Sequence, residues 1–268
     1  MIIGIDSAKW QGKLPVFELE EAGIQFAVLK AGQGAYKNPD VAFKENFDRL
    51  SLTKVLKSAY WYFTDADPIV QAELFIKIVD RVQDCDLPLM IDFEDRTTVY
   101  KGRQLGDRLR TMQRRVRELS GQSKLFLYSY RPYIEEFLAG DDLSDIIVEN
   151  YYWHAEYPRL LLQDARACGR LPPKIPEPKL PLAWVRAGVK ATLHQFDGDG
   201  GCALPNGVDA DFNVFHGSLE ELRQLLPRYE VADTLPAPPS VRYYDTPSVP
   251  NALDVVTSDV ILGDKKGE

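Results

Sequence analysis

The sequence predicts an α/β barrel of about eight strands. Three observations lead to this fold class. Short apolar segments of strand length alternate with amphipathic segments of helix length, which is the pattern of parallel α/β folds. The chain has 268 residues, enough for one such barrel. Several strand candidates end in acidic or aromatic residues, as expected where barrel strands present a catalytic face.

The predicted elements follow one another in order. The first three strand candidates and the helix candidates that follow them are 2–6 then 16–23, 26–32 then 40–50, and 57–63 then 68–82. A fourth strand over 88–94 precedes a charged helix over 104–121, and Gly121 is placed to end this helix in a left-handed cap. Ser218 and Glu221 form a capping box for a final helix. The remaining strand candidates are 124–130, 145–151, 191–196 and 210–215.

Residues 1–228 therefore form the predicted barrel domain. Two segments of the chain do not follow the alternation of strands and helices. Residues 158–190 are rich in proline and too long for an ordinary connection, so they are either a functional lid or a solvated insertion. Residues 229–268 begin as a Pro-rich linker and end polar. We expect this C-terminal tail to pack on the barrel, to pair with another chain or to be partly disordered.

Composition excludes several classes of protein. A formal net charge of -8 and a pI near 5.1 argue against a nucleic-acid binder, whose surface is usually basic. No apolar window is long enough for a membrane span, and the first residues do not form a secretory signal.

No metal or other cofactor is expected. The cysteines and histidines are dispersed and show no metal-ligand spacing, so the thiols are interpreted as reduced and structural. They are Cys85, Cys168 and Cys202, and His154, His194 and His216. The glycine-rich run 197–201 lacks the ligand pattern of a calcium loop and is interpreted as a turn.

The stretch "PLMIDFED" (88–95) places two acids at the end of a buried strand. In an extended strand, residues i and i+2 share a face, so Asp92 and Glu94 point the same way while Phe93 points the other way. A strand that simply reaches solvent would also end in acids, and Asp95 continues the polar loop. Spacing alone leaves both readings open.

Other strand ends carry residues suited to binding or catalysis. The predicted catalytic face adds Asp6 and Asp211 to the paired acids, because carboxylates beside aromatic rings are the equipment for cleaving a glycosidic bond. Mutual repulsion raises the pKa of the best-buried carboxyl, so it can hold a proton near neutral pH. The candidate substrate-binding residues are Lys30, Tyr60, Trp61, Tyr62, Tyr128, Trp153, Tyr157, Gln195 and Asp209.

Eight segments in order resemble one enzyme family. They are "GIDSAKWQG" (4–12), "VLKAGQG" (28–34), "SAYWYF" (58–63), "MIDFE" (90–94), "LYSY" (127–130), "WHAEY" (153–157), "HQFDGDGG" (194–201) and "VDADFNVF" (208–215). This pattern is similar to that of the glycoside hydrolase family 25 lysozymes and spans residues 1–226. The resemblance implies a flattened, irregular TIM-like β/α barrel that cleaves the β-1,4 bond between N-acetylmuramic acid and N-acetylglucosamine in bacterial cell-wall peptidoglycan.

The resemblance also implies roles for the acids. Glu94 matches the general acid of the family's DxE motif, and Asp92 its partner, which orients or charge-stabilises the substrate N-acetyl group. Asp6 and Asp211 would tune the charge of this pair and bind substrate. Asp209 competes with Asp211 for the last acidic position, and Asp211 is favoured because an asparagine and a phenylalanine follow it at the family's spacing. Without a signal peptide, such an enzyme would be made in the cytoplasm and reach the wall after lysis or by separate export.

Three departures from the family pattern leave other functions open. Tyr60, Trp61 and Tyr62 replace a common Tyr-His-Phe run, and residues 194–196, His-Gln-Phe, replace Trp-Gln-Tyr. The segment 158–190 has no clear counterpart in the family. An altered groove would fit a non-catalytic glycan-binding barrel, and the tail would fit a structural role in a larger assembly.

Overall fold

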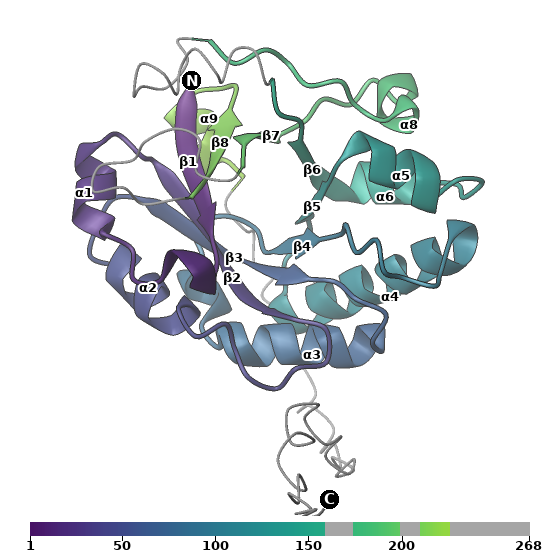
Figure 1. Cartoon of the computed structure of the whole chain (residues 1–268), viewed down its shortest axis with the longest axis horizontal. Helices are drawn as coiled ribbons and strands as arrows, with labels where there is room; N and C mark the ends of the chain where they lie inside the picture. The colour runs from purple at the N-terminus through teal and green to yellow at the C-terminus, as the bar shows by residue number, and fades with distance from the viewer. Residues whose placement is uncertain (159–173, 199–209, 226–268) are drawn as a thin grey trace, which may run out of the picture. The chain divides into compact units, whose positions relative to one another are not determined.

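Strands that alternate with helices close into a barrel in the computed structural model, which describes residues 1–158, 174–198 and 210–225 (Figure 1). The strands of the described part are β1 (Ile2–Ser7), β2 (Phe26–Gln33), β3 (Leu56–Tyr62), β4 (Met90–Asp92), β5 (Leu125–Ser129), β6 (Asn150–Ala155), β7 (Leu193–Asp197) and β8 (Asp211–Phe215). Each strand pairs with the next in sequence, and β8 pairs with β1. The predicted eight-stranded barrel is confirmed.

The last strand runs against the others. Pairing is parallel from β1 to β7, whereas β8 is antiparallel to both β7 and β1. The start of β8 therefore lies at the edge of the barrel where the parallel strands end. Asp211 begins β8 and is paired in register with Asp6 near the end of β1. Because β8 is antiparallel, its first residue, Asp211, lies at the same edge of the barrel as the ends of the parallel strands.

Helices and short 3-10 turns surround the barrel (Figure 1). Their bounds are η1 (Lys9–Gln11), α1 (Val16–Glu21), α2 (Phe43–Leu50), α3 (Pro68–Val79), η2 (Val82–Asp84), α4 (Gly102–Ser120), α5 (Arg131–Phe137), α6 (Ser144–Glu149), α8 (Leu182–Arg186) and α9 (Leu219–Arg223). Gly121 ends α4 with a φ of 71°, a backbone angle that glycine adopts without strain. The capping box of Ser218 and Glu221 begins α9. Both predicted caps are confirmed.

One predicted strand is wrong. Residues 145–151 were expected to be extended, but Ser144–Glu149 forms α6 and the strand β6 begins only at Asn150. A short apolar run cannot be assigned to a strand or to a buried helix by periodicity alone. Here Ile146 and Ile147 are the buried face of a short helix. The true strand lies among the aromatic residues that follow.

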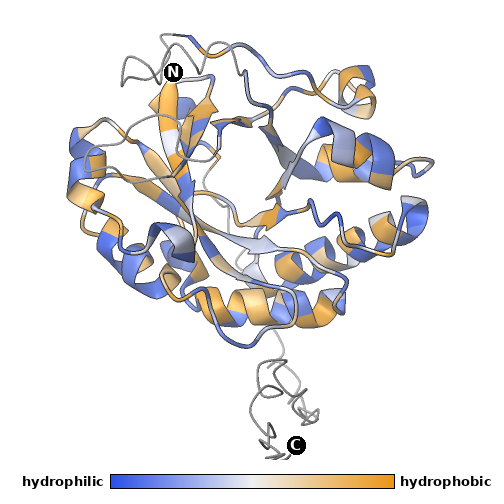
Figure 2. Cartoon of the chain, in the orientation of Figure 1, coloured by the Kyte–Doolittle hydropathy of each residue, from blue (hydrophilic) through white to orange (hydrophobic). Residues whose placement is uncertain are grey.

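Two apolar layers hold the fold together. Side chains that point into the barrel include Phe26, Val28 and Phe126, and those that point outward pack beneath the helices. Hydrophobic and hydrophilic residues alternate along the helices (Figure 2), and α4, for example, buries Leu109 and Val116. The alternation along each strand decides which of its residues can reach the mouth of the barrel.

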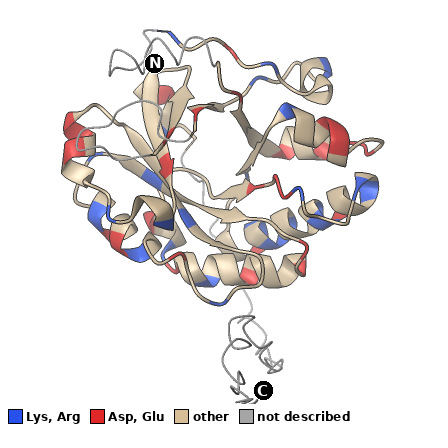
Figure 3. Ribbon diagram, in the orientation of Figure 1, with Lys and Arg blue, Asp and Glu red and all other residues tan. Residues whose placement is uncertain are grey.

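The outer surface is charged and extensively paired. Lysine, arginine and acidic residues are interleaved along the helices (Figure 3). Arg110 of α4, for example, contacts the carboxylates of Asp141 and Asp145 at 2.8 and 2.6 Å. Within the described ranges, no helix combines the length and apolar character needed to cross a membrane.

Candidate active site

Four acids gather at the mouth of the barrel from three strands and one loop. Asp6 ends the inward face of β1, Asp92 ends β4, Glu94 follows two residues later, and Asp211 begins β8. The predicted alternation around Glu94 is present, because Phe93 packs outward against Tyr133 at a centroid distance of 5.2 Å. The structure therefore brings together all four carboxyl groups predicted from the sequence to be catalytic.

Asp6 is held by a chain of buried amides. Its Oδ2 accepts hydrogen bonds from Gln195 Nε2 at 2.8 Å and from Asn213 Nδ2 at 2.7 Å. Asn213 Oδ1 in turn accepts a bond of 2.7 Å from Trp153 Nε1, inside the barrel. Burial and the charge of Asp211 raise the pKa of Asp6 well above its usual value, although both amide bonds act against this. Asp6 is thus fixed in place and kept from ionising easily.

Gln195 links the acids to two tyrosines. Its Oε1 accepts hydrogen bonds from the hydroxyls of Tyr128 at 2.8 Å and Tyr157 at 2.7 Å, while its Nε2 also reaches Asp211 Oδ2 at 3.5 Å. Both the oxygen and the nitrogen of this one buried amide group are therefore used. Gln195 orients the phenols on one side and the carboxylates Asp6 and Asp211 on the other, so it is a positioning residue more than a surface for ligand.

The pair Asp92 and Glu94 is poised to hold protons. Asp92 is only 7% exposed, and its Oδ1 has no hydrogen-bond partner. Burial raises the pKa of Asp92 well above its usual range, and the charge of Glu94 raises it further. Burial also raises the pKa of Glu94 to about 7, with Lys30 acting against this and Asp211 adding to it. At neutral pH the pair therefore carries less than its full negative charge.

Lys30 is the cation of the cluster. It projects from β2, and its Nζ lies 4.9 Å from the centroid of the Tyr62 ring. Burial lowers the pKa of Lys30, and the negative charge of Asp92 opposes that effect. Lys30 therefore counters the negative charge of the acids from the β2 side.

The predicted aromatic residues divide into exposed and buried groups. Tyr157 is partly exposed and Tyr62 is half-buried, whereas Tyr60 and Tyr128 are almost covered at the floor of the site. Trp153 lies below them in the barrel interior, where its ring meets that of Tyr128 at a centroid distance of 4.6 Å. The prediction of direct substrate binding by Trp153 is therefore wrong, because this side chain is buried and supports the site from beneath.

The prediction for Trp61 is also wrong. Its ring is 0% exposed and lies outside the barrel wall, 5.6 Å from the ring of Phe75 in α3. Gly32 makes room for it, since a Cβ there would lie 2.5 Å from the indole. Strand alternation points Tyr60 and Tyr62 inward and Trp61 outward. Asp209, the remaining candidate, lies outside the described residues.

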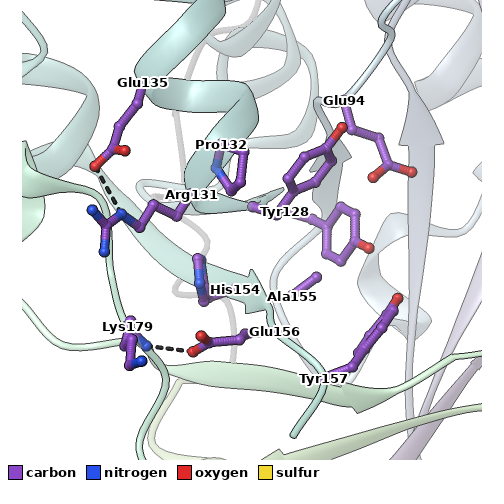
Figure 4. A pocket seen from close by; sticks show the side chains of 11 residues that line it. Glu94, Tyr128, Arg131, Pro132, Glu135, His154, Ala155, Glu156, Tyr157 and Lys179 are labelled. Atoms are coloured by element: carbon purple, nitrogen blue, oxygen red, sulfur yellow. Dashed lines mark hydrogen bonds and ion pairs between the residues drawn. The ribbon is translucent and has the colours of Figure 1, made fainter. Parts of the chain in front are cut away.

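A cavity of about 750 Å³ opens beside Glu94 (Figure 4). The rings of Tyr128 and Tyr157 lie with Glu94 at one side of it. Charged groups lie at the other side, where Arg131 Nε donates to Glu135 Oε1 at 2.9 Å. The sequence analysis missed several residues that line this cavity. They are Tyr130, Arg131, Pro132, Glu135, His154, Ala155, Glu156 and Lys179.

The signal that could have identified some of these residues is their position after a strand. Arg131 begins α5 two residues after the end of β5, and Glu156 follows β6 directly. Lys179 offers no such signal, because it lies in the Pro-rich segment and reaches the cavity only through tertiary packing. Its backbone N–H donates to Glu156 Oε2. The charged wall of the cavity is thus built by three separate segments.

The described half of the Pro-rich segment packs on the barrel. Ile175 and Trp184 are buried, and the Trp184 ring stacks on Tyr152 at a centroid distance of 4.6 Å. Residues 174–190 are therefore anchored on the barrel through these side chains, while most of their other side chains are exposed. Residues 159–173 lie outside the described part, and so do the tail 229–268, Cys168 and Cys202; Cys85 is a buried free thiol.

Two histidines make hydrogen bonds in the wall of the site. His194 Nε2 lies 2.7 Å from the carbonyl oxygen of Glu156, and His154 Nδ1 lies 3.0 Å from the Tyr152 hydroxyl. Burial lowers the pKa of His154 to about 3. In the described part of the chain, no group of three His, Cys, Asp or Glu side chains is placed to hold a metal ion.

The arrangement can donate a proton next to a concave, partly aromatic surface. Glu94 is the accessible member of the pair, and its pKa of about 7 allows it to hold a proton at neutral pH and to release it. The charge of Asp211 beside Glu94 would stabilise a cationic transition state. This combination suits cleavage of an acetal such as a glycosidic bond.

We compared the sequence with protein families and with known proteins. Residues 5–169 match the family Glycosyl hydrolases family 25. The "Uncharacterized protein YegX" of Escherichia coli (strain K12) is 30% identical over 228 residues, which cover 83% of this chain and 72% of that protein.

Solved structures share the fold at lower identity. A family 25 glycosyl hydrolase from Bacillus anthracis superposes with a TM-score of 0.66 at 23% identity, covering 84% of this chain and 93% of its own. A family GH25 lysozyme from Aspergillus fumigatus has a TM-score of 0.66 at 17% identity, covering 85% and 99%. A bacterial lysozyme from Streptomyces coelicolor has a TM-score of 0.65 at 18% identity, covering 84% and 96%.

Proposed function

The chain belongs to glycosyl hydrolase family 25 and is a glycoside hydrolase, and we propose that it cleaves the β-1,4 bond between N-acetylmuramic acid and N-acetylglucosamine in bacterial peptidoglycan. The observation that carries this proposal is the position of Glu94, a carboxyl group with a pKa of about 7 at the edge of a cavity of about 750 Å³. Several proteins of the same fold are described as lysozymes or muramidases, which favours a peptidoglycan substrate.

Glu94 acts as the general acid in this proposal. It transfers its proton to the glycosidic oxygen as the bond from that oxygen to the anomeric carbon breaks, so the leaving sugar departs as a neutral alcohol. A water molecule later adds to the anomeric carbon and returns a proton to Glu94. A pKa near 7 suits both steps, because the group holds a proton before the reaction and recovers it afterwards.

Asp92 orients the substrate N-acetyl group. It lies on the same side of the chain as Glu94 and retains 7% exposure at the mouth of the barrel, where its carboxyl group would accept a bond from the acetamide N–H. That contact would turn the acetamide oxygen toward the anomeric carbon for internal attack. Asp211 contributes negative charge nearby, which stabilises the positive charge that develops on the sugar, while Asp6 accepts the amide bonds that fix this side of the site.

The outward direction of the substituted residues favours an enzyme over a non-catalytic binding barrel. Trp61, which replaces the histidine common in the family, lies in the apolar layer beneath α3. His194 and Phe196 also point outward, while Gln195 between them points to the acids. These three substitutions therefore change the packing of the barrel wall, whereas Tyr62 points inward beside Lys30. The inward residues that match the family pattern remain at the acids.

The pH dependence should move in opposite directions when the two charges beside Glu94 are removed. The positive charge of Lys30 lowers the pKa of Glu94 and the negative charge of Asp211 raises it. A general acid is active when protonated, so the alkaline limb of kcat/KM follows its pKa. We expect Lys30→Met to move this limb to higher pH and Asp211→Asn to lower pH, each by about half a unit.

Profiles of kcat/KM from pH 4 to 9 on a soluble peptidoglycan fragment would measure these shifts. The matched control is Lys13→Met, because Lys13 is an exposed lysine paired with Glu45 on the outer surface. Shifts of the two variants in the same direction would contradict the assignment of the limb to Glu94.

Analysis of the released sugars tests the proposed bond. Purified peptidoglycan is digested, reduced with borohydride and examined by mass spectrometry. Reduced N-acetylmuramic acid at the new ends supports the proposal, whereas reduced N-acetylglucosamine, or no release from several wall types, overturns it. Because the substrate is external, we also propose that the protein reaches the wall after lysis or by separate export.

A further inference from the structure

A second concave site lies on the opposite side of the acids from the cavity at Glu94. It has a volume of about 420 Å³ and is formed where β1 and β2 end and by the loop after β2. We call it the Trp10 groove, and its lining includes Lys9, Trp10, Lys30, Gln33, Tyr36 and Asp40. Lys30 belongs to this groove and also interacts electrostatically with Asp92 and Glu94. Lys30 therefore connects this groove to the acid cluster.

The aromatic residues of the groove are unusually exposed. Trp10 is 81% exposed and Tyr36 is 65% exposed, whereas the other three tryptophans of the chain are at most 2% exposed. Neither ring contributes much to the core, because most of its surface remains in water. Exposed aromatic faces beside polar groups are typical of binding sites, since a ring offers a large rigid surface that an apolar sugar face can cover.

The two loops that carry these rings are tied together. Asp40 accepts the backbone N–H of Lys9 at 3.0 Å through Oδ2 and that of Ala42 at 3.0 Å through Oδ1. The loop after β1, with Trp10, is thus fixed to the loop after β2, with Tyr36. A site whose walls are held in place before binding loses less conformational entropy when a ligand arrives.

Positive charge lies along the same groove. Lys9 Nζ is 4.5 Å from the Trp10 ring centroid, so the ammonium sits over the aromatic face. Lys30 lies at the inner end of the groove, next to the acids. An acidic substituent on a sugar stacked against Trp10 would therefore find Lys9 within reach. A neutral sugar polymer would leave that charge unused.

We propose that the Trp10 groove is a second sugar-binding site, which holds an amino sugar with an acidic substituent in the same glycan strand whose bond is cleaved at Glu94. The inference rests on the proposed function, because it takes the strand to cross the acid cluster. Trp10 provides the stacking surface, Tyr36 bounds the ring, and Lys9 pairs with the carboxylate of the substituent. Strands long enough to reach the groove would then bind more tightly than short ones.

Fluorescence quenching tests this site directly, because Trp10 is the exposed tryptophan and the other three are buried. In the Glu94→Gln variant, which prevents turnover, iodide should quench Trp10. A peptidoglycan tetrasaccharide with its peptides should protect Trp10 from iodide at concentrations that saturate binding measured by calorimetry. Binding of the tetrasaccharide without protection of Trp10 would overturn the inference.

Affinity measurements with three further substitutions, each made in the Glu94→Gln background, complete the test. Trp10→Ala should weaken tetrasaccharide binding roughly tenfold, while Phe17→Ala, which removes a 49% exposed aromatic ring from α1, should leave it unchanged. Lys9→Gln should weaken binding of the tetrasaccharide but not of chitotetraose, which lacks the acidic substituent. Equal effects of Lys9→Gln on both sugars would overturn the acidic part of the inference.

Failure of this inference can be told from failure of the proposed function. Release of muropeptides by the wild-type protein reports on the function and does not require the Trp10 groove. If muropeptides are released but Trp10 remains fully quenched and Trp10→Ala binds normally, the groove proposal alone is wrong. If no muropeptides are released while Trp10 is protected by the tetrasaccharide, the groove binds glycan and the proposed hydrolysis is wrong.

Discussion

Replacing Glu94 with Gln is expected to lower kcat on peptidoglycan about 10³-fold, the typical loss when a general acid is removed. Gln keeps the size of the side chain but has no proton to donate to the leaving oxygen. Because Glu94 makes no hydrogen bond with the other described residues and lies at the edge of the cavity, we expect the thermal unfolding temperature to stay unchanged or to rise. Release of reducing ends under saturating substrate would measure the loss.

Glu135→Gln is a matched control for this experiment. Glu135 lines the same cavity but lies at its far side, where it accepts a hydrogen bond from Arg131. It is therefore an acid in the same pocket without a place in the proton transfer. We expect its kcat to remain within a few-fold of the wild type. If Glu135→Gln lost as much activity as Glu94→Gln, the choice of general acid would be wrong.

The barrel and its acids could be predicted because both depend on local patterns. Period-two alternation placed Asp92 and Glu94 on one face, and the structure has Phe93 packed on the other. The same rule, applied to Trp61, would have placed it away from Tyr60 and Tyr62. Its size and its position near a strand end suggested a binding residue, whereas the face it occupies made it part of the core.

Other features depend on contacts that no local pattern contains. The hydrogen bond between Trp153 and Asn213 joins residues 60 positions apart, and that between Gln195 and Asp6 joins residues 189 apart. Both are possible only because β8 runs antiparallel between β7 and β1. The sequence identified these residues as site candidates. Their division into residues that face ligand and residues that position others required the closed sheet.

Hydrogen bonds from positioning residues allow several acids to lie near one another. Asp6 has its two amide donors, and Asp211 is reached by the same Gln195 side chain. Asp92 has no such support on Oδ1. A carboxylate in that position destabilises the folded chain more than its neighbours do, since buried charge without a partner is unfavourable. Asp92 should therefore be the site where catalysis and stability conflict most.

Asp92→Asn should accordingly stabilise the protein at alkaline pH while impairing catalysis. The folded-state pKa of Asp92 is raised above its unfolded value of about 4. Between these two values the folded state binds more protons than the unfolded state, so stability is lost as pH rises. Asn cannot ionise and avoids this loss. We expect a gain of about 1 to 2 kcal/mol in the free energy of unfolding at pH 8, and little gain at pH 4.

Urea unfolding at both pH values measures the gain, with Glu21→Gln as the control, because Glu21 is an exposed carboxyl at the end of α1. The same Asp92→Asn protein should show kcat about 10²-fold below the wild type, because a neutral amide orients the substrate acetamide less strongly than a carboxylate. A variant that is less stable at pH 8 than at pH 4, relative to the wild type, would show that Asp92 is held by favourable interactions. A variant that is more stable and less active would instead show that Asp92 lowers the stability of the fold and is needed for catalysis.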